Sequence, residues 1–522
     1  MRILLLMVIL SGILQACGGG GGGSTTPNPT ITPAPSPSTS PSPTPTLSPT
    51  VTPTSSPSPS PSVSPTPSPS VYPGQAELPM PLPMEINTDD QVTLSQSTYT
   101  YTHWAYSLDS ENAIESVNYN QLDTTVYDVW VMENRYLKVT LLPEYGGRIL
   151  SIYNKLTEHE ELYQNPVGSP YLNNYGIFYY DWLMVLGGIF PTFPEPEHGK
   201  TWLLPWHMEI VDGGGQIATI RMYIQDEINY SQKPGRYNNG VTNIICTFTV
   251  SLKAGRTAVD TVVTLENPTD QTQTYEYWTN TTLTPGSDPA DPRATDGLEM
   301  VADISALSYG VGDYGILQNE TPTWPVIKDF VNHEIAGIAY PAPDISNTNV
   351  WGAINHDNGE GIFRIADNTI TKGLKIWTFG RDNTLNLDPF GNTTNDSNFE
   401  RPYVELWAGI SRFFFEDAQI AAESYFHIPE IYSPSVGLSY VTHASDDVLV
   451  NTSGTRLEMY FLTPDQDYRV VISQGSVGMI DNIITPDPAN GNYIEGLSNP
   501  GDGQTNLSIF DAAGQEVLNV DF

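Results

Sequence analysis

The sequence predicts an all-β protein, built as a large two-sheet sandwich with a small β-module at its C-terminal end. Apolar residues alternate with polar ones, or run together, over strand-length segments such as 136–141, 217–222 and 257–265. Clusters of Asp, Asn, Gly and Pro punctuate these segments as turns. No segment carries an amphipathic helical pattern longer than about three turns.

Composition excludes one class of partner. The 522 residues include 59 Asp and Glu against 21 Lys and Arg, so the formal net charge is -38. A phosphate backbone would repel such a surface, so we expect no nucleic-acid partner. The same charge disfavours peripheral docking onto anionic lipid.

The first residues of the chain resemble a segment that targets a protein to a membrane. Met1 and Arg2 precede an apolar run over 3–14, which is too short for a mature transmembrane helix but suits a signal peptide. The junction ends in Ala16-Cys17 and resembles the bacterial lipobox. That resemblance implies removal of residues 1–16 and lipidation of Cys17; the alternative is an ordinary secretory signal with an incidental cysteine. We expect a lipid-anchored protein of the bacterial cell envelope, facing the periplasm or the exterior.

Residues 17–84 form the next predicted segment, a disordered stalk. Within it, residues 24–73 contain 17 Pro, 25 Ser or Thr and no charged residue. Such a stretch has almost nothing to bury and cannot offset the entropy of folding. Its Ser-Pro and Thr-Pro steps favour extended polyproline II.

The predicted folded part begins near residue 85. Residues 85–432 are expected to form the large sandwich, and 433–522 a small β-sandwich-like module, with terminal strands of the main fold as the alternative. Cys246 lies in an apolar run and is expected to be a buried free thiol in a strand. With Cys17 lipidated, no disulfide would be available.

One family resemblance covers residues 120–430. The segment 133–149, with its Gly146-Gly147 turn, resembles the opening of the galactose mutarotase-like (aldose 1-epimerase-like) superfamily. Its continuation resembles an uncharacterised bacterial mutarotase-like domain family of unknown function. Further stretches at 187–199, 277–280 and 403–409 agree in order. The resemblance implies a β-supersandwich whose concave sheet binds carbohydrate.

Glu405 is the first predicted catalytic residue. It lies in the apolar and aromatic strand 403–407, where burial of an unpaired charge would cost several kcal/mol. Desolvation would raise the pKa of its carboxyl and improve it as a base. In the superfamily, a glutamate on a comparable strand takes the proton from the anomeric hydroxyl. The alternative is a structural ion pair with Arg401 or Arg412.

His198 is the second predicted catalytic residue. The pair His198-Gly199 resembles the His-Gly segment of aldose epimerases, in which the histidine contacts the sugar ring. His207 is a competing candidate. The resemblance also predicts a second histidine, acting as general acid, where this chain has Thr281. A threonine hydroxyl is no useful acid near neutrality, which weakens the expectation of epimerase activity.

The predicted substrate-binding residues combine aromatic faces with polar groups, as sugar sites require. They are Arg148, Trp202, Trp206, Trp278, Asn280 and Trp407. The alternatives are an ion pair for Arg148 and core positions for most of the tryptophans. No cofactor is expected, because the sequence has no phosphate-binding loop or dinucleotide fingerprint. No metal is expected from its cysteines; the acidic loops 288–291 and 388–396 could bind Ca²⁺ through oxygen ligands, but neither matches an ordered calcium-loop spacing, so solvated loops are favoured.

Three classes of function remain open from the sequence. They are a sugar-active enzyme of aldose 1-epimerase type, a non-catalytic carbohydrate-binding lipoprotein, and an accessory domain of a polysaccharide lyase or glycosidase. A further alternative is a structural surface protein without catalytic activity. We expect a monomer whose ligand is a mono- or oligosaccharide and which meets the membrane only through its N-terminal lipid.

Overall fold

The computed structural model of the chain describes most of its C-terminal four-fifths. The described residues are 90–111, 114–171, 183–195, 198–229, 240–291, 297–303, 307–308, 337–341, 344–379, 403–474, 477–497 and 505–522. The predicted signal peptide, Cys17 and the stalk lie outside these ranges, as do Arg401 and the acidic loop 388–396.

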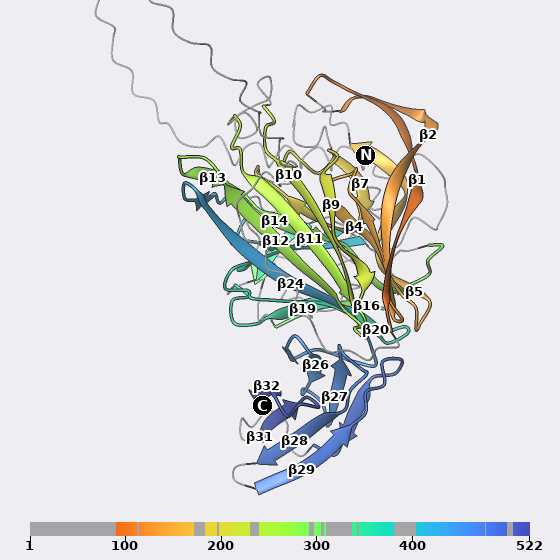
Figure 1. The fold of residues 1–522 in the computed structure, drawn as a ribbon, viewed down its shortest axis with the longest axis vertical. Helices are drawn as coiled ribbons and strands as arrows, with labels where there is room; N and C mark the ends of the chain where they lie inside the picture. Colours follow the sequence, from red (N-terminus) through yellow and green to blue (C-terminus); the bar gives the residue numbers. More distant parts are fainter. Residues whose placement is uncertain are drawn as a thin grey trace, which may run out of the picture. The chain divides into compact units, whose positions relative to one another are not determined.

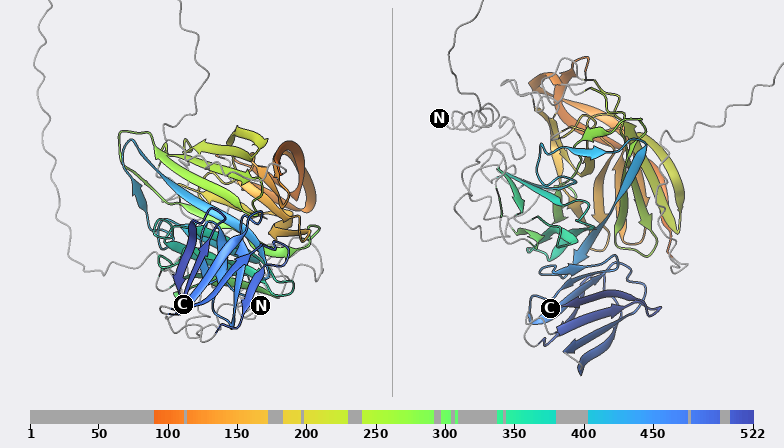
Figure 2. Two further views of the ribbon diagram at one scale, coloured as in Figure 1. Left: turned by 60° about the horizontal axis from the view of Figure 1, so that its bottom comes forward. Right: turned by 90° about the vertical axis from the view of Figure 1, so that its left-hand side faces the viewer.

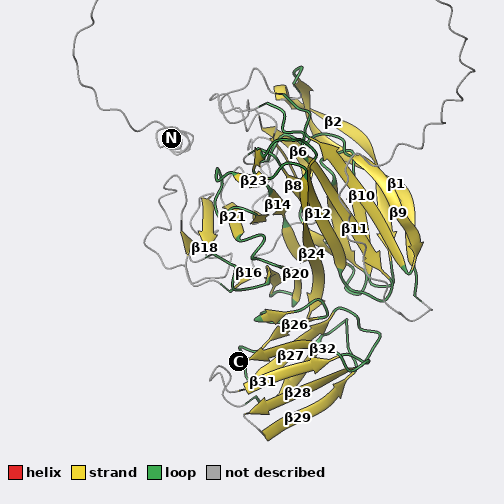
Figure 3. Ribbon diagram, turned by 60° about the vertical axis from the view of Figure 1, so that its left-hand side comes forward, coloured by secondary structure: helices red, strands yellow, loops and turns green. Residues whose placement is uncertain are grey.

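Every regular element in these ranges is a β-strand, which confirms the predicted all-β class (Figures 1 and 3). None of the described segments is a helix with the length and apolarity that a membrane crossing needs. β-Branched and aromatic residues dominate the strands, as their fit to a pleated, half-buried surface requires.

The first of two large sheets is antiparallel throughout (Figure 1). Its strand order is β9 (His207–Gly215), β10 (Ile217–Gln225), β11 (Ile245–Lys253), β12 (Val259–Asn267), β24 (Ser424–Val436), β20 (Glu360–Ala366), β19 (Val350–Asn355) and β16 (Leu298–Ala302).

The second large sheet carries the predicted site residues. Its strand order is β1 (Val92–Leu108), β2 (Ile114–Glu133), β3 (Leu137–Leu142), β4 (Arg148–Asn154), β8 (Ile189–Thr192), β14 (Trp278–Thr281), β22 (Tyr403–Gly409), β21 (Gly373–Phe379), β18 (Gly337–Pro341) and β17 (Leu307–Ser308). Two residue pairs between β1 and β9 connect the two sheets at one edge.

Shorter strands complete the large fold. Four of them border the second sheet: β5 (His159–Leu162), β6 (Gln164–Tyr171), β7 (Leu183–Gly187) and β15 (Leu283–Ser287). β13 (Gln273–Tyr275) and β23 (Ala418–Ile420) pair as a separate two-stranded ribbon.

The main hydrophobic core lies between the two large sheets. The first sheet contributes residues such as Phe248 and Val250 on β11, and the second contributes Ile149, Leu406 and Ile376. Cys246 is a buried free thiol on β11, as predicted, and burial raises its pKa well above the ordinary value. The strands therefore alternate between this core and the faces that point away from it.

The last eight strands form two further four-stranded sheets with a core of their own (Figure 2). One sheet orders β25 (His443–Ala444), β26 (Val448–Asn451), β27 (Arg456–Phe461) and β30 (Asn492–Glu495); the other orders β29 (Val477–Ile484), β28 (Tyr468–Gln474), β31 (Thr505–Phe510) and β32 (Glu516–Asp521). β24 continues to Val436, past the predicted start of the C-terminal module, and the predicted domain boundaries stay predictions.

Hydrogen bonds and apolar contacts join this C-terminal group to the large fold. The amide of Thr257 donates to the carbonyl of Leu462 at 2.9 Å, and Arg256 donates to the carbonyl of Asp446 at 2.8 Å. A second apolar cluster includes Phe363 of β20 and Leu449 of β26. The first sheet thus has part of its far face covered as well as its core face.

Candidate functional site

Four neighbouring strands of the second sheet, β8, β14, β22 and β21, carry the predicted site. Their register aligns one residue from each strand in a row across the sheet: Phe190, Asn280, Trp407 and Lys375. Residues paired in antiparallel register point to the same side of a sheet. We call this side, with Glu405 and Trp278 two residues along their strands, the site face.

The opposite side of the same strands belongs to the main core. Ile189, Leu374, Ile376, Leu406 and Ala408 all lie in the cluster between the sheets. We call this side the core face. Strand alternation alone therefore separates the polar and aromatic residues from the aliphatic ones.

His198 and Glu405 meet at the indole of Trp407. The Trp407 and His198 rings meet in a T-shaped contact with centroids 5.0 Å apart, and Nε1 of Trp407 donates to Glu405 Oε2 at 2.8 Å. His198 also contacts the ring of Trp202, with centroids 5.3 Å apart. The two predicted catalytic side chains are thus neighbours on the site face, although they lie far apart in sequence.

Several polar atoms on this face are buried without a hydrogen-bond partner in the part of the chain that the structure describes. They are His198 Nδ1, Asn280 Oδ1, Trp202 Nε1 and Trp278 Nε1. Most buried polar groups in proteins are hydrogen-bonded, so a cluster of exceptions requires an explanation. A ligand that brings hydroxyl groups to this face would supply the partners.

Lys375 is a buried cation that the sequence reasoning missed. Its Nζ lies 3.5 Å from the ring centroid of Trp407 and 3.6 Å from that of Phe414. The aromatic faces stabilise the ammonium in place of water. The sequence shows only a lysine between Leu374 and Ile376; the register that places it beside Trp407 comes from the structure.

The surroundings of His198 keep its imidazole neutral. Burial is the main cause that lowers its pKa well below the ordinary value, and the charges of Lys375 and Arg148 lower it further. A neutral imidazole has one N–H donor and one acceptor nitrogen. This side chain is therefore suited to hydrogen bonding with a ligand and poorly suited to delivering a proton near neutral pH.

Arg148 does not fit its predicted contact with substrate. The side chain is as buried as those of Trp407 and Asn280, but its guanidinium donates to backbone carbonyls, that of Tyr145 at 2.8 Å and that of Gly187 at 2.7 Å. It also packs over the ring of Phe190 at 4.2 Å. These contacts hold the turn after β3 against the site face, which makes Arg148 a support for the site rather than a part of its surface.

Trp206 does not fit its predicted role either. Its ring packs in the main core, edge to face with Phe193, and its Nε1 donates to the carbonyl of Thr201. Gly147 has a φ of 56°, and a Cβ at that position would lie 2.5 Å from Cδ2 of Trp206. The glycine of the predicted turn is thus explained by the turn and by close packing against this indole.

Three further residues that the sequence analysis named are also placed. His207 begins β9 in the first sheet, where it is exposed and stacks on Tyr223, so it does not join the site face. Thr281 lies on the core face, and its hydroxyl donates to the carbonyl of Leu406 at 2.6 Å. Arg412, one suggested partner of Glu405, donates to the carbonyl of Pro341.

Of the predicted site residues, five surround one another on or over the site face: His198, Glu405, Trp202, Trp278 and Trp407, with Asn280 in the same row. Phe414 completes this aromatic group, because its ring meets those of Trp278 and Trp407 edge to face. Their catalytic and binding roles stay predictions.

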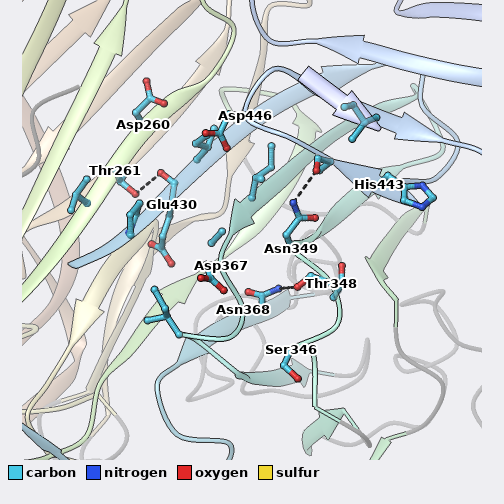
Figure 4. Close-up of a pocket in the computed structure, with 18 of the residues that line it drawn as sticks. Asp260, Thr261, Ser346, Thr348, Asn349, Asp367, Asn368, Glu430, His443 and Asp446 are labelled. Carbon is cyan, nitrogen blue, oxygen red and sulfur yellow. Dashed lines mark hydrogen bonds between the residues drawn. The ribbon is translucent and has the colours of Figure 1, made fainter. Parts of the chain in front are cut away.

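A cavity of about 950 Å³ lies elsewhere, on the far face of the first sheet, and none of the predicted site residues lines it (Figure 4). Among residues with described positions, no group of three or more His, Cys, Asp or Glu is arranged to hold a metal ion. The candidate site consists of aromatic rings, one carboxylate, one imidazole, one amide and the ammonium of Lys375.

Comparisons with known proteins agree with this fold. Residues 112–220 match the model of a family described as a domain of unknown function (DUF5107). A TPR-domain containing protein from Parabacteroides distasonis is similar in structure, with a TM-score of 0.50 and 17% identity. That match covers 66% of this chain and 55% of the other, so this chain spans little more than half the length of the Parabacteroides protein.

Two further solved structures are more distant. A candidate aldose 1-epimerase from Klebsiella pneumoniae has a TM-score of 0.42 and 13% identity over 65% of this chain and 91% of its own. A galactose mutarotase-like protein from Lactobacillus casei has a TM-score of 0.39 and 10% identity over 59% of this chain and 99% of its own. The structural neighbours are thus galactose mutarotase-like and aldose 1-epimerase-like proteins, as the sequence resemblance predicts.

Proposed function

We propose that this protein binds carbohydrate on the site face, with Glu405, His198 and Asn280 bonding to sugar hydroxyls between the rings of Trp202, Trp278 and Trp407. The observation that carries the proposal is the set of buried, unpartnered polar atoms among aromatic rings. A pyranose offers apolar C–H faces and equatorial hydroxyls, which is the combination that such a surface complements.

The chemistry of the site favours binding over turnover. Opening a hemiacetal ring needs a base for the anomeric O–H proton and an acid that protonates the ring oxygen as its bond to C1 breaks. Glu405 can serve as the base. His198 is held neutral, and Thr281 lies on the core face, so the chain supplies no evident acid from the predicted set.

Titration of a panel of mono- and oligosaccharides, followed by saturation-transfer NMR, tests the proposal directly. The same samples report anomer interconversion, which separates a binding protein from an epimerase. We expect saturation transfer to a sugar and no acceleration of mutarotation. Absence of saturation transfer for every sugar in the panel contradicts the proposal. Rapid anomer interconversion would mean that the protein is an epimerase and not only a binding protein.

The decisive variant is Glu405→Gln, which keeps the side-chain shape and an acceptor for Trp407 Nε1. A sugar hydroxyl that donates to the carboxylate would lose a charge-assisted hydrogen bond, so we expect affinity to fall about tenfold. Glu227→Gln is the matched control, because Glu227 is exposed and lies outside the site face. Equal affinity of both variants would place the sugar elsewhere.

We further propose that the chain is held at the bacterial cell envelope by lipid on Cys17. The support is the lipobox-like junction that precedes the Pro-, Ser- and Thr-rich stalk. Cys17→Ser should leave an unprocessed precursor or release soluble protein, as seen by membrane fractionation and metabolic lipid labelling. Unchanged labelling of the variant would disprove lipidation at this cysteine.

A further inference from the structure

His198 lies in a segment whose backbone is fixed on both sides of this residue. The segment begins at Phe193, directly after β8, and the ring of Phe193 is fully buried in the main core. The amide of Lys200 donates to the carbonyl of Phe193 at 3.0 Å. Gly199 has a φ of 66°, and a Cβ there would lie 2.4 Å from the carbonyl oxygen of Phe193. Residues 199 and 200 therefore turn back tightly against Phe193 immediately after the imidazole.

Lys200 anchors this segment with a buried ammonium. The residue is 2% exposed, and its Nζ donates to the carbonyls of Ile228 at 3.1 Å and Gly240 at 3.0 Å. It also donates to Oδ2 of Asp226 at 3.1 Å. An ammonium has three N–H donors, so each donor of Lys200 has its own acceptor. The side chain is thus committed to the protein and has no donor to offer to a ligand.

The acceptor of this ion pair is itself held in place. Asp226 follows β10 and is fully buried, and its Oδ2 accepts from the amide of Thr242 at 2.9 Å and from its hydroxyl at 2.8 Å. Glu195, on the same segment as His198, adds a second carboxylate at 3.6 Å from Lys200 Nζ. The network therefore ties the His198 segment to the connection between β10 and β11 of the first sheet.

Such a pair fixes direction more than it adds stability. Removing two charges from water costs about as much as their attraction returns, so a buried ion pair is weak evidence for stability. The imidazole of His198 lies against the rings of Trp202 and Trp407, and its Nδ1 has no hydrogen-bond partner within the described ranges. Its orientation therefore depends on where the backbone of residue 198 is held, and Lys200 holds that backbone two residues along.

We propose that Lys200 and Asp226 are positioning residues for the carbohydrate site. They hold the His198 segment so that the imidazole lies against Trp407 and bonds to a sugar hydroxyl, and neither of them contacts the sugar. The inference rests on the proposed sugar binding. It adds that sugar affinity depends on a buried ion pair outside the site face.

The double variant Lys200→Met with Asp226→Asn is the main test. It approximates both side-chain shapes and removes the pair without leaving an unpaired charge, so we expect it to fold. Lys200→Met alone leaves the Asp226 carboxylate buried without its cation and should melt at a lower temperature than the double variant. Lys253→Met is the matched control, because Lys253 pairs with Asp260 at 3.2 Å in the first sheet and lies outside the site face.

The position of the imidazole can be measured without a sugar. The Cε1–H signal of His198, assigned by comparison with His198→Gln, should be displaced by the ring currents of Trp202 and Trp407, whose centroids lie 5.3 and 5.0 Å away. We expect the double variant to lose this displacement and the Lys253→Met control to keep it. An unchanged signal in the folded double variant, or a changed one in the control, would overturn the assignment. Failure of the double variant to fold would also overturn it, because the pair would then serve the fold.

Affinity for glucose, galactose and maltose is the second readout. For whichever of them binds the parent protein, we expect about a tenfold loss in Lys200→Met and in the double variant, because each loses the His198 hydrogen bond to the sugar. A pair that serves only stability predicts that affinity returns together with the melting temperature in the double variant, and that result would overturn the assignment. If no sugar binds the parent, the proposed function fails, and the His198 signal still decides whether the pair holds the imidazole.

Discussion

The two faces of β8, β14, β22 and β21 are equally buried, but they differ in whether their buried polar atoms have hydrogen-bond partners. On the core face, Leu406 and Ala408 are fully buried among aliphatic side chains of both sheets. On the site face, Trp407 and Asn280 are also almost fully buried, yet Asn280 Oδ1 lacks a partner in the described structure. Burial alone therefore does not distinguish a core from a site; the state of the polar atoms does.

The largest effect is expected on the core face. Leu406→Ala should lower the free energy of unfolding by about 2–5 kcal/mol, because it removes a fully buried side chain and leaves a cavity. Denaturant unfolding followed by tryptophan fluorescence measures it. Glu405→Gln, one residue away on the site face, is the matched comparison and should cost less than about 1 kcal/mol. Similar losses from both changes would erase the distinction between the faces.

On the site face, we expect the larger loss of stability from a substitution that adds volume. A Cβ on Gly409 would lie 2.3 Å from Cε3 of Trp278, so Gly409→Ala forces this indole to move. We expect a loss of about 1–3 kcal/mol in unfolding free energy, together with loss of sugar binding. Gly213→Ala is the control, because nothing lies within 4 Å of its added Cβ. Retained sugar affinity in Gly409→Ala would remove Trp278 from the proposed site.

The contrast between the faces also explains what the sequence could predict. Strand alternation and the ordered motifs were sufficient for the all-β fold and for naming Glu405 and Trp407 as site candidates in one strand. They also located His198 near the site, because its segment resembles a known one. These features depend on residues that lie close together along the chain, so they can be predicted from the sequence.

What the sequence could not supply depends on contacts between distant segments. Arg148 was predicted to face substrate, but the carbonyl of Gly187, 39 residues on, accepts its hydrogen bond and keeps it inside. Lys375 became a site residue only through the register of β21 with β22. The cavity on the far face of the first sheet requires the C-terminal group to meet that sheet, which no local pattern encodes.

A smaller effect is expected from pH, through His198. Its folded pKa is depressed, so below the ordinary value of about 6.5 the unfolded chain binds a proton that the folded chain does not. Stability from this residue is therefore present above about pH 6.5 and declines below it, by up to about 1.4 kcal/mol per pH unit. The decline ends only below the folded pKa.

Comparison with His198→Gln isolates this contribution. Other groups titrate in the same range: burial raises the pKa of Glu195 to about 7, which gives a slope of the opposite sign. That slope is common to both proteins and cancels in their difference. Unfolding free energies at pH 7.5 and 5.5 should show a steeper loss in the parent protein. Parallel pH profiles would contradict the prediction, because they would mean that the pKa of His198 is the same in the folded and unfolded chains.

The smallest effect should come from Thr281, which stands where the resemblance predicts an acid but lies on the core face. Its hydroxyl donates to the carbonyl of Leu406 at 2.6 Å, so Thr281→Val keeps the shape and removes one buried hydrogen bond. We expect a loss of about 1 kcal/mol in unfolding free energy and unchanged sugar affinity. Asn280→Ala, its neighbour on the site face, should reduce sugar affinity, because it removes an oxygen that has no partner in the described structure and that we assign to the sugar. If Thr281→Val instead impaired sugar binding or any anomer interconversion, the two faces would not be functionally separate, and the hydroxyl would have to reach the ligand by a rearrangement of β14.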